Sequence, residues 1–167
     1  MRSTLKDVHL ALFGDNDLPE PAKTPTLAEP SKVLPTICIA AMLALDTNTL
    51  ARLLVCGNAK HAKAADQFIA KGAWVSHLVS AETLWVLQAV YNRTAAQMAA
   101  ALDLLLEHES LMLQDAETVR SALTQFQLQP ALGFSNFLVL EIARKAWHLP
   151  LGTFDKALAK LGGAQKL

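Results

Sequence analysis

Short apolar runs that end on a carboxylate and lead into a helix-like segment constrain the fold of this chain most. The run Met42–Leu45 is followed at once by Asp46, and a helix-like stretch begins at Thr49. A buried strand that stops at a charged residue and turns into a helix is the repeating unit of parallel α/β proteins. Ligands of such proteins bind beyond the carboxyl ends of the strands. The sequence therefore predicts an α/β protein with charge at its strand ends.

The same pattern recurs twice further along the chain. Trp74–Val79 leads to Glu82, and Leu151–Thr153 leads to Asp155. Each acid alone has an ordinary structural explanation, because Asp is favoured at helix N-caps and acids are favoured in the first helical turn. These explanations do not account for the coincidence of three carboxylates at three strand-to-helix junctions, which share one edge of a parallel sheet.

Carboxylates that converge at one edge repel each other unless a cation compensates their charge. We therefore expect Asp46, Glu82 and Asp155 to share a divalent ion. Oxygen ligands with no Cys or His beside them favour Mg²⁺, with Mn²⁺ as a possible substitute, over zinc.

Periodicity and capping residues predict alternating strands and helices, hence a three-layer α/β/α sandwich with a mostly parallel central sheet. The expected strands, the last of them a core strand, are Met42–Leu45, Ala73–His77, Leu111–Leu113 and Leu151–Thr153. The expected helices are Thr49–Leu54, Ala59–Lys71, Ala81–Tyr91, Ala95–Leu106, Ala116–Leu128, Asn136–Trp147 and Asp155–Leu161. Their expected N-caps include Ser80, Thr94 and Ser135.

Residues 1–41 differ in composition from the rest of the chain. They hold five of the seven prolines and show no sustained periodicity. We expect either a poorly ordered N-terminal extension or a misassigned start, since Met42 could itself be the first residue. Residues 42–167 are enough for one domain with its own core.

Charge and cysteine content exclude few functions. The 15 basic and 15 acidic residues give a formal net charge of zero, so the overall field argues neither for nor against nucleic acid. Cys38 and Cys56 suggest neither a disulfide scaffold nor a zinc site, which suits a reducing compartment. No apolar run approaches the ~18 residues of a membrane helix. We therefore expect a cytoplasmic protein that does not bind a membrane.

Four segments of the chain resemble, in order, the motifs of PIN-domain proteins. They are Leu43–Asn48, Ser80–Leu87, Gly133–Leu138 and Gly152–Asp155. More specifically, they are similar to the VapC-like toxins of bacterial toxin–antitoxin operons, over residues 42–167. The resemblance implies a Mg²⁺-dependent endoribonuclease on a three-layer α/β/α sheet. It also implies a homodimer, and an antitoxin that inserts a segment into the active-site groove.

The resemblance assigns catalytic and metal-binding roles residue by residue. Asp46 matches the first acid of the family, Glu82 the second and Asp155 the fourth. At the position of the third acid the family usually has Asp, whereas this chain has Asn136. An amide carbonyl can still ligate a hard cation, but the substitution removes one negative charge from the expected site.

Other residues are expected to support the acids or to contact RNA. Asn48 and Thr153 match the polar residues that support the acids of the family. Arg52, Arg93 and Lys156 could contact the RNA backbone, because RNA binding depends mainly on phosphate neutralisation. The alternative for each of these basic residues is a solvated helix face.

Three functions remain open from the sequence. The leading one is a ribonuclease toxin that hydrolyses phosphodiesters at an acidic metal site. The second is a weakened or inactive PIN module that acts by binding antitoxin or RNA, and Asn136 favours it. The third is an aspartyl-phosphate phosphotransferase or a phospho-receiver domain. It is disfavoured because Asn48 stands where a second Asp is expected and no lysine-bearing strand end completes a receiver site.

Overall fold

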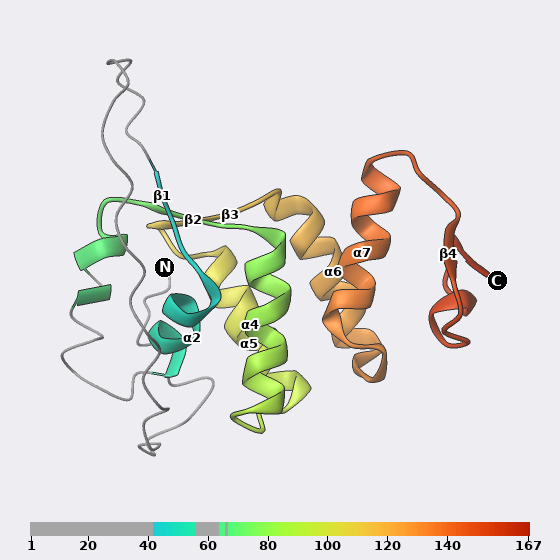
Figure 1. Ribbon diagram of the computed structural model, residues 1–167, viewed down its shortest axis with the longest axis horizontal. Helices are drawn as coiled ribbons and strands as arrows, with labels where there is room; N and C mark the ends of the chain where they lie inside the picture. The colour runs from blue at the N-terminus through green and yellow to red at the C-terminus, as the bar shows by residue number, and fades with distance from the viewer. Residues whose placement is uncertain (1–41, 56–63, 66) are drawn as a thin grey trace, which may run out of the picture.

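The computed structural model describes residues 42–55, 64–65 and 67–167. This part of the chain is an α/β structure with a parallel three-stranded sheet and helices on both sides of it (Figure 1). The predicted α/β/α class is therefore confirmed, although the central sheet is small. Every helix in the described ranges is too short or too polar to span a bilayer.

The central sheet has the strand order β1-β2-β3. Its strands are β1 (Leu43–Ala44), β2 (Ala73–Val75) and β3 (Leu111–Leu113), and all of them run parallel. The middle strand carries Ala73 and Val75, which are fully buried. Continuous burial of this kind is typical of parallel sheets covered by helices on their faces.

Besides the helical residues 64–65 and 67–69, five α-helices accompany the sheet in the described part of the chain. They are α2 (Thr47–Val55), α4 (His77–Ala89), α5 (Ala95–Leu106), α6 (Ala116–Leu128) and α7 (Phe134–Lys145). Helix α2 packs on α4, α5 packs on α6, and α6 packs on α7. Phe126 of α6 meets Phe134 of α7 edge to face, with ring centroids 6.2 Å apart. The core therefore runs from the sheet into a layer of paired helices.

The bounds of α5 and α6 follow from local sequence and confirm the predicted ranges. Thr94 caps α5, because its hydroxyl accepts from the Gln97 N–H while the Gln97 side chain accepts from the Thr94 N–H. Such a reciprocal capping box satisfies two N–H groups that the helix leaves unpaired. Helix α6 ends at Leu128, before Pro130, which cannot continue a helix.

The start of α4 differs from the prediction. Ser76 is the N-cap, and its hydroxyl accepts from the Val79 N–H. The prediction that Ser80 caps this helix is wrong, because Ser80 is buried inside it and donates to the Ser76 carbonyl. Either serine has a suitable side chain, but only Ser76 directly follows the strand. Glu82 therefore lies in the second helical turn rather than in the first.

Helices α6 and α7 are joined by an ion pair at Asp115, the residue before α6. Its φ of 45° lies in the left-handed region, which Asp tolerates better than most residues. Thr118 donates to one carboxylate oxygen at 2.8 Å, and Lys145 of α7 donates to the other at 2.5 Å. The hydrogen bond from Lys145 lowers the pKa of the Asp115 carboxyl, and Asp115 raises the pKa of Lys145.

Helix α7 begins at Phe134. It follows the 3₁₀ turn η1 (Pro130–Leu132) and Gly133, which has a φ of 77°. The prediction that Ser135 caps this helix is wrong, since Gly133 is the N-cap residue and supplies no side chain.

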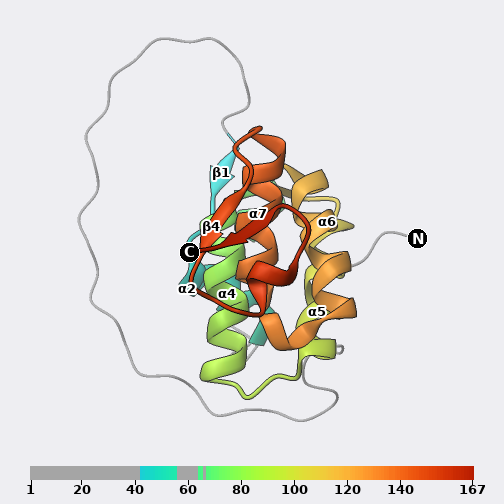
Figure 2. The same ribbon diagram turned by 90° about the vertical axis from the view of Figure 1, so that its right-hand side faces the viewer.

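The C-terminal strands form a second, two-stranded sheet. Strand β4 (Leu151–Thr153) pairs in parallel with β5 (Ala164–Lys166), and the 3₁₀ turn η2 (Leu158–Lys160) lies between them. We call residues 151–166 the C-terminal unit. It stands beyond α7, at the end of the molecule opposite β1 (Figure 1), and faces the viewer in front of α7 in Figure 2.

Two predictions for this region are wrong. Leu151–Thr153 is a strand but does not belong to the central sheet, and Asp155–Leu161 forms one short 3₁₀ turn instead of a helix. A local apolar pattern identifies a strand but does not specify its partner, which explains the first error.

Some predictions fall on residues outside the described ranges. The expected extension 1–41 is one of them. Residues 59–63 and 66 of the expected helix Ala59–Lys71 are others, whereas residues 64–65 and 67–69 are helical and Gly72 follows with a φ of 87°.

Candidate functional site

Asp46 lies where β1 leads into α2. The Leu45 N–H donates to the Trp74 carbonyl at 2.9 Å, so the chain is held to β2 up to the residue before Asp46. Leu45 is buried, whereas Asp46 is exposed. Its Oδ1 accepts from the Thr49 N–H at 2.7 Å. Asp46 therefore caps the start of α2, and no hydrogen bond within the described residues uses its second oxygen, Oδ2.

Glu82 is held beside the same junction by Thr47, the residue after Asp46. The Thr47 hydroxyl donates to Glu82 Oε2 at 2.5 Å. Glu82 belongs to α4, which packs on α2. The structure thus links Glu82 to the residue that follows Asp46, at the junction of β1 and α2. Sequence reasoning missed Thr47, for which its position next to Asp46 was the available indication.

Asn136 lies in the first turn of α7, the helix that packs on both α4 and α6. Its Nδ2 donates to the Leu132 carbonyl at 2.8 Å. Only the amide nitrogen can donate to a carbonyl, so this hydrogen bond fixes the orientation of the amide. Within the described ranges, no hydrogen bond joins Asn136 to Asp46 or Glu82. The amide therefore serves the junction between η1 and α7.

Asp155 lies in the C-terminal unit and caps the turn that follows it. Its Oδ1 accepts from the N–H groups of Ala157 and Leu158, at 2.7 and 3.2 Å. Its own N–H donates to the Thr153 hydroxyl at 3.0 Å.

The expected cluster of three acids is not assembled within one chain. Strand β4, which Asp155 follows, stands at the end of the molecule opposite β1 (Figure 1), because β4 pairs with β5 rather than with the central sheet. Across residues 42–55, 64–65 and 67–167, no three His, Cys, Asp or Glu side chains form a group suited to a metal ion. Glu82 is hydrogen-bonded to Thr47, the residue after Asp46, whereas Asp155 belongs to the separate C-terminal unit.

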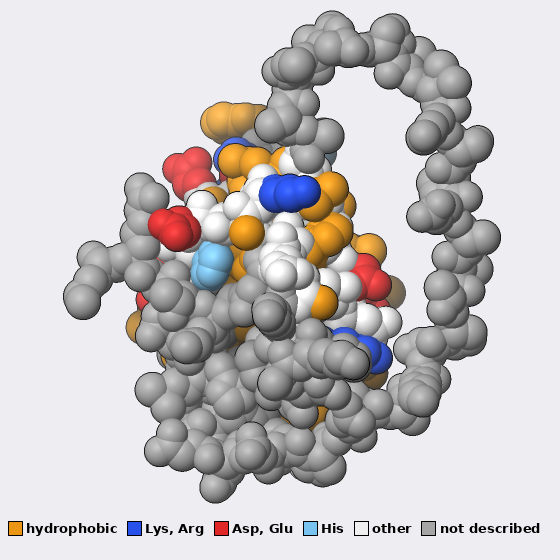
Figure 3. Space-filling view, turned by 90° about the vertical axis from the view of Figure 1, so that its left-hand side faces the viewer, with side chains coloured by type: hydrophobic (Ala, Val, Ile, Leu, Met, Phe, Trp, Pro, Cys, Tyr) orange, Lys and Arg blue, Asp and Glu red, His pale blue; other side chains and the backbone are white. Residues whose placement is uncertain are grey.

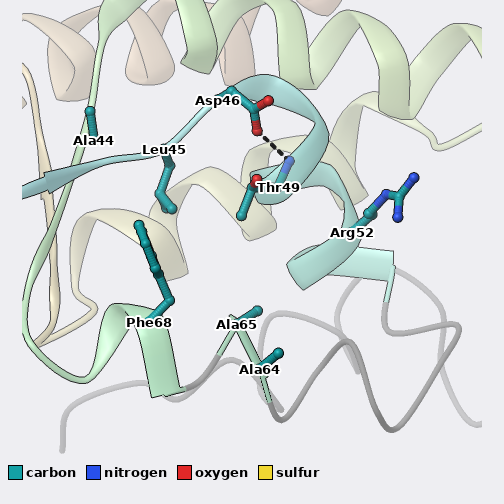
Figure 4. Close-up of a pocket in the computed structure, with 8 residues that line it drawn as sticks. All are labelled: Ala44, Leu45, Asp46, Thr49, Arg52, Ala64, Ala65 and Phe68. Atoms are coloured by element: carbon teal, nitrogen blue, oxygen red, sulfur yellow. Dashed lines mark hydrogen bonds between the residues drawn. The ribbon is translucent and has the colours of Figure 1, made fainter. Parts of the chain in front are cut away.

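A pocket of about 400 Å³ opens beside Asp46 (Figure 4). Apolar side chains, including Leu45 and Phe68, form most of its wall. Its charged lining residues, among those described, are Asp46 and Arg52. Arg52 is exposed on α2, close in sequence to the helix start that Asp46 caps.

The other candidate polar and basic residues are placed differently. Asn48 is exposed in the first turn of α2. Arg93 follows α4 and is half-buried, with its Nε enclosed. Lys156 is exposed but belongs to the C-terminal unit. Of the three basic candidates, Arg52 is the one that lines the same pocket as Asp46.

The coloured side chains on the face that Figure 3 shows mix acidic, basic and apolar groups. This mixture agrees with the zero net charge of the chain.

No family model, curated protein or solved structure matches this chain. The resemblance of its four motifs to PIN-domain proteins therefore stays a prediction.

Proposed function

We propose that this protein is a cytoplasmic, Mg²⁺-dependent endoribonuclease that acts as the toxin of a toxin–antitoxin pair. The observation that carries the proposal is the hydrogen bond from Thr47 to Glu82. It holds the Glu82 carboxylate at the residue after Asp46, at the carboxyl end of β1, where α/β proteins bind their ligands. The motif resemblance adds the reaction class, the homodimer and the antitoxin partner.

The two adjoining acids suit Mg²⁺. Asp46 and Glu82 each accept a hydrogen bond from the protein through one carboxylate oxygen, and the other oxygen of each can bind a cation. Mg²⁺ in proteins commonly takes one or two carboxylates and completes its shell with water and substrate phosphate oxygens. When bound, it would lower the pKa of a water molecule and stabilise charge on the phosphoryl oxygens. Mn²⁺ accepts the same oxygen ligands.

The remaining residues of the site bind and orient the substrate. Thr47 positions Glu82, and Arg52 neutralises an RNA phosphate beside Asp46. The apolar wall that includes Phe68 leaves space for a base or a ribose. A pocket of this size and character is typical of sites for small groups.

A second candidate is a PIN-like module that binds antitoxin or RNA without cleaving it. The hydrogen bond from Asn136 to the Leu132 carbonyl favours this candidate, because it gives the amide a role in the fold. A single chain would then present two acids, Asp46 and Glu82, in place of the four-residue set that the resemblance implies.

Cleavage of a fluorescent structured RNA by the full-length protein tests the proposal. We expect cleavage with Mg²⁺ or Mn²⁺, and loss of cleavage with EDTA, in Asp46→Asn and in Glu82→Gln. Both substitutions keep an oxygen that can accept the hydrogen bond from Thr49 or from Thr47, so the local fold is preserved. Glu117→Gln, which changes an exposed acid of α6, is the matched control and should retain activity.

The outcomes separate the two candidates. Cleavage that survives both EDTA and Asp46→Asn would reject the metal site. Binding of RNA without cleavage under all conditions would favour the second candidate. Arg52→Ala should weaken RNA binding more than it changes turnover, because a phosphate contact acts mainly through affinity.

A further inference from the structure

The outer edge of β1 is open in the part of the chain that the structure describes. Among the described residues, β1 pairs with β2 alone, and the Leu45 N–H donates to the Trp74 carbonyl. Because successive residues of a strand direct their backbone groups to opposite sides, the N–H and C=O of Ala44 face away from β2. An edge of this kind is a template for another strand.

Strand β4 has a matching open edge. The Leu151 N–H donates to the Gly163 carbonyl at 2.8 Å, and the Leu167 N–H donates to the Thr153 carbonyl at 3.0 Å. By the same alternation, the backbone groups of Gly152 face away from β5. An isolated pair of strands is marginally stable, and parallel strands are normally found within larger covered sheets. Within the described part of the chain, β4 and β5 therefore lack the further strands that a parallel pair ordinarily has beside it.

Large apolar side chains are exposed around the C-terminal unit. Trp147 is 91% exposed, Phe154 is 80% exposed and Leu167 is 65% exposed. Large exposed apolar side chains at one end of a molecule are typical of surfaces that contact another protein.

Contacts with α7 hold the C-terminal unit away from the β1 of its own chain. Arg144 of α7 donates to the Gly162 carbonyl at 2.8 Å. Leu158 is buried, and Leu161 packs against the main core. The unit thus lies at one end of the molecule and β1 lies at the other (Figure 1). With these contacts kept, the β1 edge that the unit can reach is that of a second copy.

We propose that two copies of this chain exchange their C-terminal units, so that β4 of each adds in parallel to the β1 edge of the other. The central sheet would then have the order β3-β2-β1-β4-β5, with the last two strands from the second copy. The exchange is reciprocal and closed, as expected for a two-fold dimer. It uses the open edges of β1 and β4 and covers exposed apolar surface.

Only some alignments of β4 beside β1 place the outward-facing N–H and C=O groups of the two strands opposite each other. Setting Ala44 opposite Thr153 of the second copy allows the outward-facing groups of both strands to pair. One residue on, Leu45 then lies beside the exposed Phe154. Two residues on, Asp46 lies opposite Asp155, on strands about 4.8 Å apart.

This register has a consequence that depends on the proposed function, whereas the exchange itself does not. The second copy would contribute Asp155 to the site that contains Asp46 and Glu82. Because these carboxylates repel each other without a cation, Mg²⁺ should strengthen the dimer.

Light scattering on the full-length protein tests the exchange directly. We expect a dimer for the wild type and for Ala44→Val, which keeps the outward N–H. Ala44→Pro removes that N–H, yet proline is tolerated at a strand edge. We therefore expect this variant to remain folded by circular dichroism and to dimerise at least about tenfold more weakly. A monomeric wild type, or a folded Ala44→Pro variant that dimerises normally, would overturn the proposal.

Disulfide trapping provides a second test that does not need the proline variant to fold. Ala44→Cys and Thr153→Cys are combined after Cys38 and Cys56 are changed to serine, and the protein is oxidised. A covalent dimer that reducing agent separates is the expected result. The matched control replaces Thr153→Cys by Gln165→Cys on β5, which is one strand further away, about 10 Å, and beyond disulfide reach. A disulfide within one chain, or no disulfide, contradicts the exchange.

Mixing two inactive variants separates this proposal from the proposed function. The Asp46→Asn and Asp155→Asn variants are mixed and allowed to exchange subunits. About a quarter of wild-type cleavage should return, because half of the dimers are then heterodimers and each heterodimer contains one intact site of two. A trapped dimer without nuclease activity would overturn the proposed function and leave the exchange standing. Cleavage by a monomer would overturn the exchange and leave the proposed function standing.

Discussion

Thr47→Val is the most informative single substitution for the candidate site. Valine has nearly the shape of threonine but lacks the hydroxyl that donates to Glu82. Thr47 itself is half-buried and Glu82 is exposed. The substitution therefore removes one positioning contact while both carboxylates and the cap formed by Asp46 remain.

The expected size of the effect follows from the burial of this contact. Hydrogen bonds to charged groups contribute about 1.5–3 kcal/mol when well enclosed. Because Glu82 is open to solvent, we take about 1 kcal/mol, which corresponds to an approximately fivefold loss of kcat/KM. Glu82→Gln, which removes the charge itself, should cost far more than Thr47→Val.

Steady-state cleavage of RNA, with thermal unfolding measured in parallel, tests this expectation. Thr47→Ser keeps the hydroxyl and should retain nearly full activity. We expect Thr47→Val to lower kcat/KM with little change in melting temperature. If Thr47→Val is as active as the wild type while Glu82→Gln is inactive, Thr47 does not position the acid and the reasoning is wrong.

Three further substitutions test the fold that carries the site. Asn136→Asp should lower the free energy of unfolding by about 1–3 kcal/mol, because a carboxylate cannot donate to the Leu132 carbonyl; chemical denaturation measures this. Phe137→Ala should cost about 3–5 kcal/mol by the same assay, since this side chain is fully buried. Asp115→Asn should lower the free energy of unfolding at neutral pH, and its difference from the wild type should shrink below about pH 4. The reason is that Lys145 lowers the pKa of Asp115 in the folded state, so the pair loses its contribution as the pH falls through that lowered value. An unchanged deficit at low pH would contradict the last expectation.

Elements set by neighbouring residues were predictable from the sequence. Helix α5 has the predicted bounds because Thr94 and Gln97 satisfy each other within one turn. Helix α6 also has its predicted bounds, with Pro130 as a local stop. The fold class follows from the alternation of such segments, which also predicted Leu111–Leu113 as a strand.

Features that depend on distant contacts were not predictable in the same way. Leu151–Thr153 has the pattern of a strand, but nothing in its sequence specifies β5 as its partner. Strand β5 itself, Ala164–Lys166, contains no β-branched or aromatic residue and was missed for that reason.

The residues of the candidate site also divide into those that local sequence predicts and those that depend on distant contacts. Asp46 and Glu82 were selected because each follows a predicted strand, and Glu82 accepts a hydrogen bond from the residue after Asp46. The role of Thr47 depends on a side-chain contact across two helices, which no spacing rule reveals. The position of Asp155 depends on which strand accepts β4 as a neighbour, and this cannot be read from local residues.

The left-handed backbone at residue 115 restricts how this chain can vary. Glycine or asparagine would satisfy the conformation, but aspartate also supplies the charge that holds the end of α7. A bulky or β-branched replacement would be strained there and would also leave Lys145 without this anion. Evolutionary drift or engineering at this partly exposed position is therefore confined to a few residue types, and the cost of a wrong choice extends to both helices.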